Sequence, residues 1–349
     1  MSNQQLYNVA VVGATGAVGE QILRLLDERN FPVGELKLLS SPRSAGKKLR
    51  FRTREIVVEA ATPDSFRGID FALFSAGGSV SLELVPHAVK SGAICIDNTN
   101  AFRMDPDTPL VVPEVNADQI AKHKGIIANP NCSTIQMVTA LKPLYDRYGI
   151  SRIIVSTYQA VSGAGNLAMD ELISQTKDVL GGKEANPQIL PVASLPVKHQ
   201  IAFNAIPQID KFQDNGFTLE EMKMTRETKK IMGDDSLQVT ATCVRIPVLR
   251  GHSESVYVEL KSDFDLEDVR SLLADAPGVV VMDNPAEQVY PMATNAAGRN
   301  EVFVGRLRKD LFHPRALNMW IVSDNLLKGA AWNAVQIAEH IVKTRQSSN

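Results

Sequence analysis

Short apolar runs alternate with amphipathic stretches through the first part of the chain. Residues 8–12, NVAVV, form such a run and end at a glycine, as expected of a strand buried in a parallel sheet. Residues 17–28 repeat apolar side chains at the helical spacing and predict a helix. This alternation predicts a doubly wound, Rossmann-like α/β domain. The further expected strands are 36–39, 71–74, 94–96 and 126–128, with another helix over 82–90.

The pattern changes near residue 130, where longer β-rich runs begin. Residues 150–160, 238–245 and 255–261 are runs of this kind, and the last alternates apolar with polar side chains. Such alternation is typical of a sheet with one covered face. We therefore expect an α+β domain with a mixed, largely antiparallel sheet. Residues 181–208, rich in Pro, Gly and Asn, predict a long surface excursion.

The C-terminal stretch 325–342 returns to the helical spacing. We expect this helix to pack back on the first domain. The first domain would then comprise residues 1–130 and 325–349, and the second would comprise residues 131–324.

The composition excludes several classes of protein. The chain has 349 residues, a length typical of two domains, and its net charge is −2 with acids and bases mixed. No basic stripe or basic amphipathic segment predicts nucleic acid or a membrane as a partner. The polar residues 1–7 lack the order of a signal peptide, and we expect a cytoplasmic protein. Three widely spaced cysteines favour neither a disulfide framework nor a metal site.

A glycine-rich loop, GATGAVG from Gly13 to Gly19, joins the first strand to the first helix. Its glycines allow a tight turn and a close approach of backbone to pyrophosphate, and the helix N-terminus supplies N–H groups. The spacing GxxGxxG differs from the plain GxGxxG, so a structural turn is the alternative. Its place after a buried strand favours a dinucleotide.

The second strand is followed by Ser40-Ser-Pro-Arg-Ser44. An NAD site usually places an acid here for the ribose 2′-hydroxyl. The segment has no carboxylate, whereas Arg43 could bind a 2′-phosphate through paired hydrogen bonds. We therefore favour NADP over NAD, with Arg43 as a solvated loop charge the alternative.

Cys132 lies in NPNCST, between the strand 126–128 and a helical stretch over 135–148. A cysteine at a helix N-terminus is stabilised as the thiolate and suits a nucleophile. Cys95 and Cys243 lie inside apolar strands and are interpreted as core residues.

Three charged or titratable features stay ambiguous from the residues alone. His252 follows Gly251 in a tight turn, where an imidazole could exchange protons with a substrate or have no role at all. The run Glu220-Glu-Met-Lys-Met224 could be a solvated helix face. Arg103 could be a surface charge.

Taken together the motifs resemble the aspartate-semialdehyde dehydrogenase family over nearly the whole chain. The similar stretches are VAVVGATGAVG, SSPRSAGK, FSAGGSVS, NPNCST, YQAVSGAG, FNAIPQID, EEMKMTRETKKI, RIPVLRGHSESV and SDNLLKGAAWNAVQIA. The resemblance implies an NADP-binding domain followed by a catalytic and dimerisation domain. It implies a phosphorylating, NADP-dependent aldehyde dehydrogenase (EC 1.2.1.11) that works as a homodimer.

The resemblance also implies a role for each matching residue. Cys132 would be the nucleophile and His252 the general acid/base. Gln159 would orient the substrate, Arg245 would bind its carboxylate and Glu220 its amino group. Arg103 and Lys223 would hold the phosphate, and Asn131 would also contact the substrate. The implied cofactor contacts are Gly13, Thr15, Gly16, Ala17, Val18, Ser40, Arg43, Ser44, Ser75, Ser162, Gly163 and Asn325.

The implied reaction reduces L-4-aspartyl phosphate to L-aspartate 4-semialdehyde through a thioester on Cys132. Its product would serve lysine (through diaminopimelate), threonine, methionine and isoleucine biosynthesis. N-acetylglutamyl-phosphate reductase is the nearest alternative, although its cysteine motif is closer to NPGCYPT. Glyceraldehyde-3-phosphate dehydrogenase is a weaker alternative, because an acidic residue would then be expected after the second strand. A non-catalytic relative would carry Cys132 as an inert thiol.

Overall fold

The computed structural model describes residues 5–347. The chain forms two compact units, Met1–Asn131 with Ala330–Asn349, and Cys132–Gly329. Residues 1–4, which are part of the N-terminal segment used to predict the location, lie outside the described residues, as do 348–349.

The first unit is built on a seven-stranded sheet with the order β3-β4-β2-β1-β5-β6-β7 in the described chain. All pairs are parallel except β3 with β4 at one edge. The expected strands are confirmed. The edge pair was not predicted, because its half-exposed residues form no buried apolar run. The strands are β1 (Tyr7–Val12), β2 (Val33–Ser40), β3 (Lys48–Phe51), β4 (Arg54–Ala60), β5 (Phe71–Phe74), β6 (Ile94–Asp97) and β7 (Ile126–Ala128).

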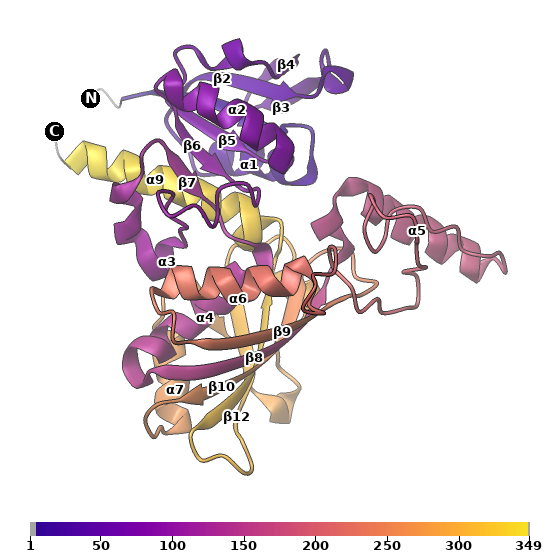
Figure 1. The fold of residues 1–349 in the computed structure, drawn as a ribbon, viewed down its shortest axis with the longest axis vertical. Helices are drawn as coiled ribbons and strands as arrows, with labels where there is room; N and C mark the ends of the chain where they lie inside the picture. Colours follow the sequence, from indigo (N-terminus) through magenta and orange to yellow (C-terminus); the bar gives the residue numbers. More distant parts are fainter. Residues whose placement is uncertain (1–4, 348–349) are drawn as a thin grey trace. The chain divides into compact units, whose positions relative to one another are not determined.

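Helices cover this sheet (Figure 1). α1 buries Ile22, Leu25 and Leu26, the apolar face that its sequence spacing predicts. The C-terminal helix α9 belongs to the same unit, and Glu339 on it pairs with Arg29, just after α1, at 3.0 Å. The helices are α1 (Ala17–Glu28), α2 (Gly78–Lys90), α3 (Pro113–Asn116) and α9 (Trp332–Ser347), with 3₁₀ turns η1 (Pro42–Ser44), η2 (Pro63–Phe66) and η3 (Ala117–Lys122).

The second unit is built on a six-stranded sheet with the order β11-β12-β13-β10-β8-β9 in the described chain. β8 and β9 are parallel, as are β11 and β12, and the other neighbours are antiparallel. This confirms the mixed, largely antiparallel sheet. The strands are β8 (Ile150–Gln159), β9 (Gln238–Arg245), β10 (His252–Leu260), β11 (Val279–Val281), β12 (Val302–Lys309) and β13 (Ala316–Ser323).

Three helices, α4 (Cys132–Tyr148), α6 (Leu219–Met232) and α7 (Leu266–Ala274), pack on this sheet and build its core. The start of α6 is set by a capping box between Thr218 and Glu221, and the left-handed Gly233 ends it. On β10, Val256, Val258 and Leu260 are buried whereas Tyr257 and Glu259 are half-buried, as the alternation predicts.

A long arm extends from this sheet after the short turn η4 (Val161–Ala164), as Figure 1 shows. It starts with α5 (Asn166–Leu180) and continues through residues 181–208, which contain no helix or strand. The carboxylate of Glu171 accepts hydrogen bonds from the backbone of Gln188 and Ile189 and ties the excursion to α5. The remaining short turns are η5 (Pro285–Glu287) and α8 (Ala293–Ala296).

The predicted C-terminal helix differs from the observed one at its start. A π-helical turn, η6 (Leu327–Ala331), precedes α9, and Asp324 caps this turn through the backbone N–H of Leu327. Nowhere in residues 5–347 is there a helix with the apolar length that crossing a bilayer requires.

Candidate active site

Cys132 is the first residue of α4 and is half-buried, whereas Cys95 and Cys243 are fully buried. Burial raises the pKa of both buried thiols far above the ordinary value. Cys132 instead lies where the N–H groups of a helix end stabilise a thiolate. A Cβ on Gly329 would lie 2.8 Å from the Cβ of Cys132, so only glycine fits beside it. The geometry therefore favours Cys132 as the reactive thiol.

Strand register brings three predicted residues into one row of the second sheet. Gln159 at the end of β8 pairs with Arg245 at the end of β9. β10 runs antiparallel to β8 and pairs Ser253 with Tyr158, which places His252 beside Gln159. The exposed fractions of Gln159, Arg245 and His252 are 1%, 4% and 0%. Three polar side chains so deeply buried are costly to keep unless they serve each other or a ligand.

His252 is held by a hydrogen bond from the residue after β8 and faces Gln159 at the end of β8. The backbone N–H of Ala160 donates to its Nδ1 at 3.0 Å, and the Nε2 atoms of Gln159 and His252 are 3.3 Å apart. Because Nδ1 accepts, the neutral ring carries its proton on Nε2. Burial first, and then the charge of Arg245, lowers the pKa of His252 to about 3. The ring is therefore neutral at neutral pH in this state.

Arg245 is fixed in the same row and interacts electrostatically with Cys132. Its Nη1 donates to the carbonyl of Ala160 at 2.7 Å. Burial lowers its pKa, while Glu220 and Cys132 act in the opposite direction. The guanidinium thus lies close enough to Cys132 to favour its thiolate form.

Gly163 lies close against this row. A Cβ at that position would lie 3.0 Å from Arg245 Nη1 and 3.4 Å from His252 Nε2. Close by in the sequence, Ser162 bonds with Asn325, whose Oδ1 accepts the N–H of Gly251. A side chain at position 163 would therefore press on both Arg245 and His252.

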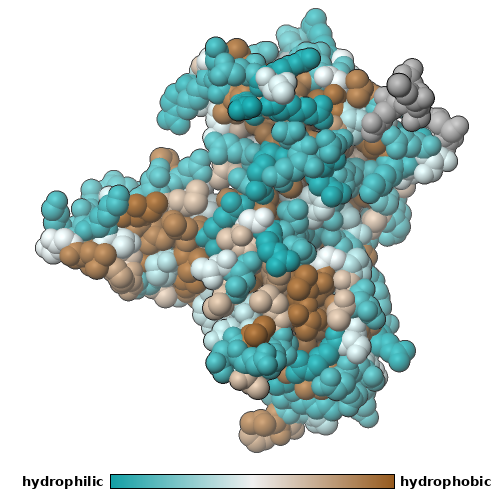
Figure 2. All heavy atoms as spheres, turned by 180° about the vertical axis from the view of Figure 1, so that it is seen from behind, coloured by the Kyte–Doolittle hydropathy of each residue, from teal (hydrophilic) through white to brown (hydrophobic). Residues whose placement is uncertain are grey.

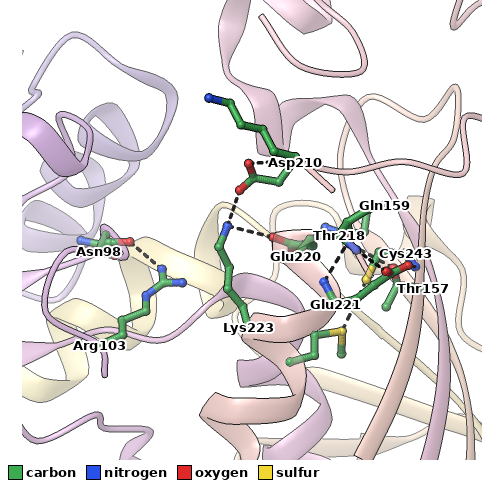
Figure 3. Close-up of polar contacts among 12 residues, drawn as sticks. Asn98, Arg103, Thr157, Gln159, Asp210, Thr218, Glu220, Glu221, Lys223 and Cys243 are labelled. Atoms are coloured by element: carbon green, nitrogen blue, oxygen red, sulfur yellow. Dashed lines mark hydrogen bonds and ion pairs between the residues drawn. The ribbon is translucent and has the colours of Figure 1, made fainter. Parts of the chain in front are cut away.

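The acidic start of α6 is buried, which overturns its interpretation as a solvated helix face. Glu220 is 4% exposed and accepts a hydrogen bond from Gln159 Nε2 at 3.2 Å. Lys223 Nζ binds Asp210 at 2.9 Å and Glu220 at 3.2 Å, as Figure 3 shows. Glu221 has a structural function, because it caps α6 and accepts the backbone N–H of Cys243.

In the first unit, Arg103 is buried and not a surface charge. Its Nε donates to the carbonyl of Asn129 at 2.9 Å. Its Nη2 donates to the carbonyl of Asn98 at 2.7 Å (Figure 3). Asn131 is also buried. These contacts fix a cation next to the segment that precedes Cys132 in the sequence.

The glycine-rich loop forms a pocket of the first unit. Gly13 has φ of +88°, and a Cβ there would lie 2.4 Å from the carbonyl oxygen of Ser75. Ser40 approaches the loop and bonds with Thr15 at 3.0 Å. The pocket is lined by Gly13, Thr15, Gly16, Ser40, Ser75 and neighbours that include Glu83. Backbone exposed in this way fits a dinucleotide phosphate.

Two family models match the chain. The semialdehyde dehydrogenase NAD binding domain matches residues 8–123, and the semialdehyde dehydrogenase dimerisation domain matches residues 141–328. The aspartate-semialdehyde dehydrogenase of Bacillus subtilis is 62% identical over 96% of this chain and 97% of its own. This chain belongs to the aspartate-semialdehyde dehydrogenase family.

Solved structures of this family agree. Aspartate semialdehyde dehydrogenase II from Vibrio cholerae, complexed with ASA, superposes with a TM-score of 0.92 at 49% identity, covering 97% of this chain and 99% of that one. Aspartate semialdehyde dehydrogenase with NADP from Candida albicans has a TM-score of 0.73 at 26% identity, covering 97% and 98%. The first domain is therefore a nicotinamide-cofactor-binding domain and the second a dimerisation domain.

Within the family fold, the second unit gathers most of the expected substrate residues: Cys132, Gln159, Glu220, Lys223, Arg245 and His252. Arg103 and Asn131 belong to the first unit. Of the expected cofactor residues, Ala17 and Val18 begin α1, Arg43 is exposed in η1 and Ser44 is buried there. Ser162, Gly163 and Asn325 belong to the second unit.

Sequence reasoning missed Asp210 and Ala160. Asp210 holds Lys223, and the backbone of Ala160 serves both Arg245 and His252. Their only signal was that they lie within the similar stretches FNAIPQID and YQAVSGAG, because a backbone contact leaves no mark on side-chain pattern.

Proposed function

We propose that the chain reduces L-4-aspartyl phosphate to L-aspartate 4-semialdehyde, with release of phosphate, and catalyses the reverse reaction. The observation that carries this is the start of α4, where Cys132 is electrostatically coupled to Arg245, which lies in the row with Gln159 and His252. A thiolate, a proton carrier and an anion-binding cation together suit acyl transfer.

Cys132 performs the covalent step. Its thiolate forms a bond to the acyl carbon, the bond from that carbon to the phosphate oxygen breaks, and phosphate leaves with the electron pair. The thioester is easier to reduce than a carboxylate, so the difficult step is divided. Bound NADPH would supply the hydride that reduces the thioester. As the proposed acid/base group, His252 shares its Nε2 proton with the resulting oxyanion through a hydrogen bond, and the oxyanion then collapses to the aldehyde as the thiolate of Cys132 leaves.

The charges around this row match the substrate. Arg245 pairs with the substrate carboxylate through its forked N–H groups, and Glu220 pairs with the amino group. Lys223 and Arg103 hold the phosphate, and Asn131 contacts the substrate. Gln159 orients the acyl oxygen from a position fixed by Glu220 and Thr157. A buried carboxylate such as Glu220 suits a free amine better than the acetylated amine of N-acetylglutamyl phosphate.

NADP is the proposed cofactor. Gly13, Thr15, Gly16, Ala17 and Val18 would bind the pyrophosphate, while Ser40, Arg43 and Ser44 would bind the 2′-phosphate. The exposed Arg43 follows β2, and the segment 40–44 contains no carboxylate. Ser75, Ser162, Gly163 and Asn325 complete the proposed contacts. The Candida albicans relative, described with NADP, supports this choice.

A cytoplasmic homodimer is the proposed form, assembled through the second domain. The arm exposes apolar side chains, namely Leu167, Ile173, Leu180, Val197 and Phe203, and brown areas cover parts of the second unit in Figure 2. Exposed apolar area of this kind marks protein interfaces. Light scattering should give twice the chain mass of 38.1 kDa. The product would feed lysine, through diaminopimelate, and threonine, methionine and isoleucine biosynthesis.

Phosphate-dependent oxidation of L-aspartate 4-semialdehyde with NADP tests the proposal. Cys132→Ala should abolish turnover, by about a thousandfold or more, because no other group can carry the acyl chain. NADP binding should persist. Cys95→Ala, at a buried core cysteine, is the matched control and should stay active. Substantial turnover by Cys132→Ala would remove the covalent mechanism, and activity on N-acetylglutamate semialdehyde alone would remove the substrate.

A further inference from the structure

Glu254 is a fully buried carboxyl group that the proposed reaction does not use. It follows His252 by two residues on β10, so both side chains lie on one face of the sheet. Register pairs Glu254 with Thr157 on β8 and with Ile321 on β13. Glu254 therefore occupies the row of the sheet next to the row of Gln159 and His252.

The surroundings of Glu254 do not stabilise an ionised carboxylate. Its exposed fraction is 0%, and neither carboxyl oxygen has a hydrogen bond of normal geometry to the residues that the structure describes. Burial raises the pKa of this carboxyl well above its ordinary value, and the amide of Gln136 opposes this only in part. A carboxyl in such a place holds its proton at neutral pH.

No nearby charge changes this conclusion. On the same face of the sheet, His252 has a pKa lowered to about 3 and is neutral, and burial raises the pKa of Cys243 so that its thiol is neutral. β8 and β13 contribute Thr157, Ile321 and Ser323, which carry no charge. α4 contributes uncharged side chains next to Cys132, and Arg245 lies in the neighbouring row on β9.

Gln136 is the neighbour that would accept a hydrogen bond from a protonated Glu254. It lies one helical turn after Cys132 on α4, so the two side chains share a face. Its Nε2 donates to the backbone carbonyl of His252 at 3.4 Å. Because a carbonyl only accepts, this contact leaves Oε1 as the free acceptor, and Oε1 has no donor among the described residues.

We propose that Glu254, as a neutral carboxylic acid, donates its proton to Oε1 of Gln136 and is a positioning residue for the proposed reaction. The pair then ties the turn of α4 that carries Cys132 to the strand that carries His252. A carboxylic acid supplies the O–H that completes the chain from Glu254 through Gln136 to the His252 carbonyl. The inference rests on the proposed function only for its kinetic readout.

Two substitutions at Glu254 test whether a hydrogen-bond donor is needed at this position. Glu254→Gln keeps a donor and the shape, so turnover of the semialdehyde should stay within about twofold of the parent. Glu254→Ala removes the donor, so kcat should fall about tenfold while KM changes less than twofold. The pH profile of Cys132 labelling by iodoacetamide, without substrate, should move to higher pH in Glu254→Ala but not in Glu254→Gln. A parent-like Glu254→Ala, or a Glu254→Gln as impaired as Glu254→Ala, would overturn the proposal.

Two further variants separate positioning from loss of stability. Val256→Ala deletes buried atoms two residues further along the same face of β10 and should leave kcat unchanged. Gln136→Met keeps the length but removes both the acceptor for Glu254 and the donor to the His252 carbonyl, so it breaks the same chain and should match Glu254→Ala. The double variant should be no worse than either single change, because both break one link. If Glu254→Ala does not fold, Gln136→Met alone decides, and parent-like kcat and labelling in it reject the link.

Different experimental results would contradict this inference and the proposed function. An inactive parent enzyme removes the function, whereas the labelling profile of Cys132 still tests the link. An active parent with unchanged variants removes only the link.

Discussion

The side-chain nitrogen of Gln159 lies 3.3 Å from Nε2 of His252, although the two residues are 93 positions apart in the sequence. Gln159 Nε2 also donates to Glu220, which fixes the direction of its amide. His252 accepts the Ala160 N–H on Nδ1, so its own proton is on Nε2. Two donors that face each other in this way need an acceptor between them. A substrate oxygen, or the oxyanion of the thioester step, is the acceptor that this arrangement suits.

Gly163→Ala should block that space. The added Cβ would lie 3.0 Å from Arg245 Nη1 and 3.4 Å from the His252 ring, so one of these groups must shift. We expect kcat/KM for the semialdehyde to fall by about 10- to 100-fold, the usual consequence of misplacing reacting groups. Gly181→Ala, at the end of α5, is the control and should leave kcat/KM unchanged. Parent-like kinetics in Gly163→Ala would show that the space is not used.

Arg245→Lys should mainly weaken substrate binding. Lysine keeps the charge but cannot donate to Ala160 and still form a forked contact with a carboxylate. The KM for the semialdehyde should rise by about tenfold or more, an effect near 1.4 kcal/mol or above, whereas kcat should change less. Steady-state kinetics at saturating NADP and phosphate measure this. An unchanged KM would contradict the proposed role of Arg245.

Arg43→Glu should penalise NADPH far more than NADH. The exposed arginine after β2 is placed to bind a 2′-phosphate, and a carboxylate there would repel it. The preference for NADPH over NADH should drop by about 100-fold, near 2.7 kcal/mol. Lys90→Glu, an equal change of charge at the exposed end of α2, should leave the preference unaltered. Equal losses with both cofactors in Arg43→Glu would show that Arg43 does not select NADP.

His252 should make the protein less stable as the pH falls. Its pKa is about 3 in the folded chain and about 6.5 in the ordinary state, so between these values the unfolded chain binds a proton that the folded chain does not. Stability is therefore lost as the pH falls below about 6.5, by up to about 1.4 kcal/mol per pH unit. At pH 5 the loss reaches about 2 kcal/mol relative to pH 7. Urea unfolding of the parent and of His252→Gln at both pH values measures this.

The parent and His252→Gln should differ in how their free energy of unfolding depends on pH. The parent should lose more stability between pH 7 and pH 5 than His252→Gln, in which the titrating ring is gone. An identical loss in the two proteins would mean that the ring is not neutral in the folded state.

The local pattern of the chain determined the type and order of many elements. The runs at 71–74 and 126–128 were recognisable because strands buried on both faces must be apolar throughout. β3 and β4 were not, because edge strands expose polar side chains and lose that signal. The sequence also singled out Cys132 as the candidate thiol, since it differs from Cys95 and Cys243 in its flanking residues.

Only the tertiary structure decided which of the candidate side chains are buried and which lie together. Glu220 and Arg103 carry charges that suit a solvated surface, and their burial became visible only after packing. The row of Arg245, Gln159 and His252 depends on the register of strands distant in the sequence, and no local pattern encodes register. The same register places Glu254 in the row next to His252, where burial, not residue type, determines whether its carboxyl keeps a proton.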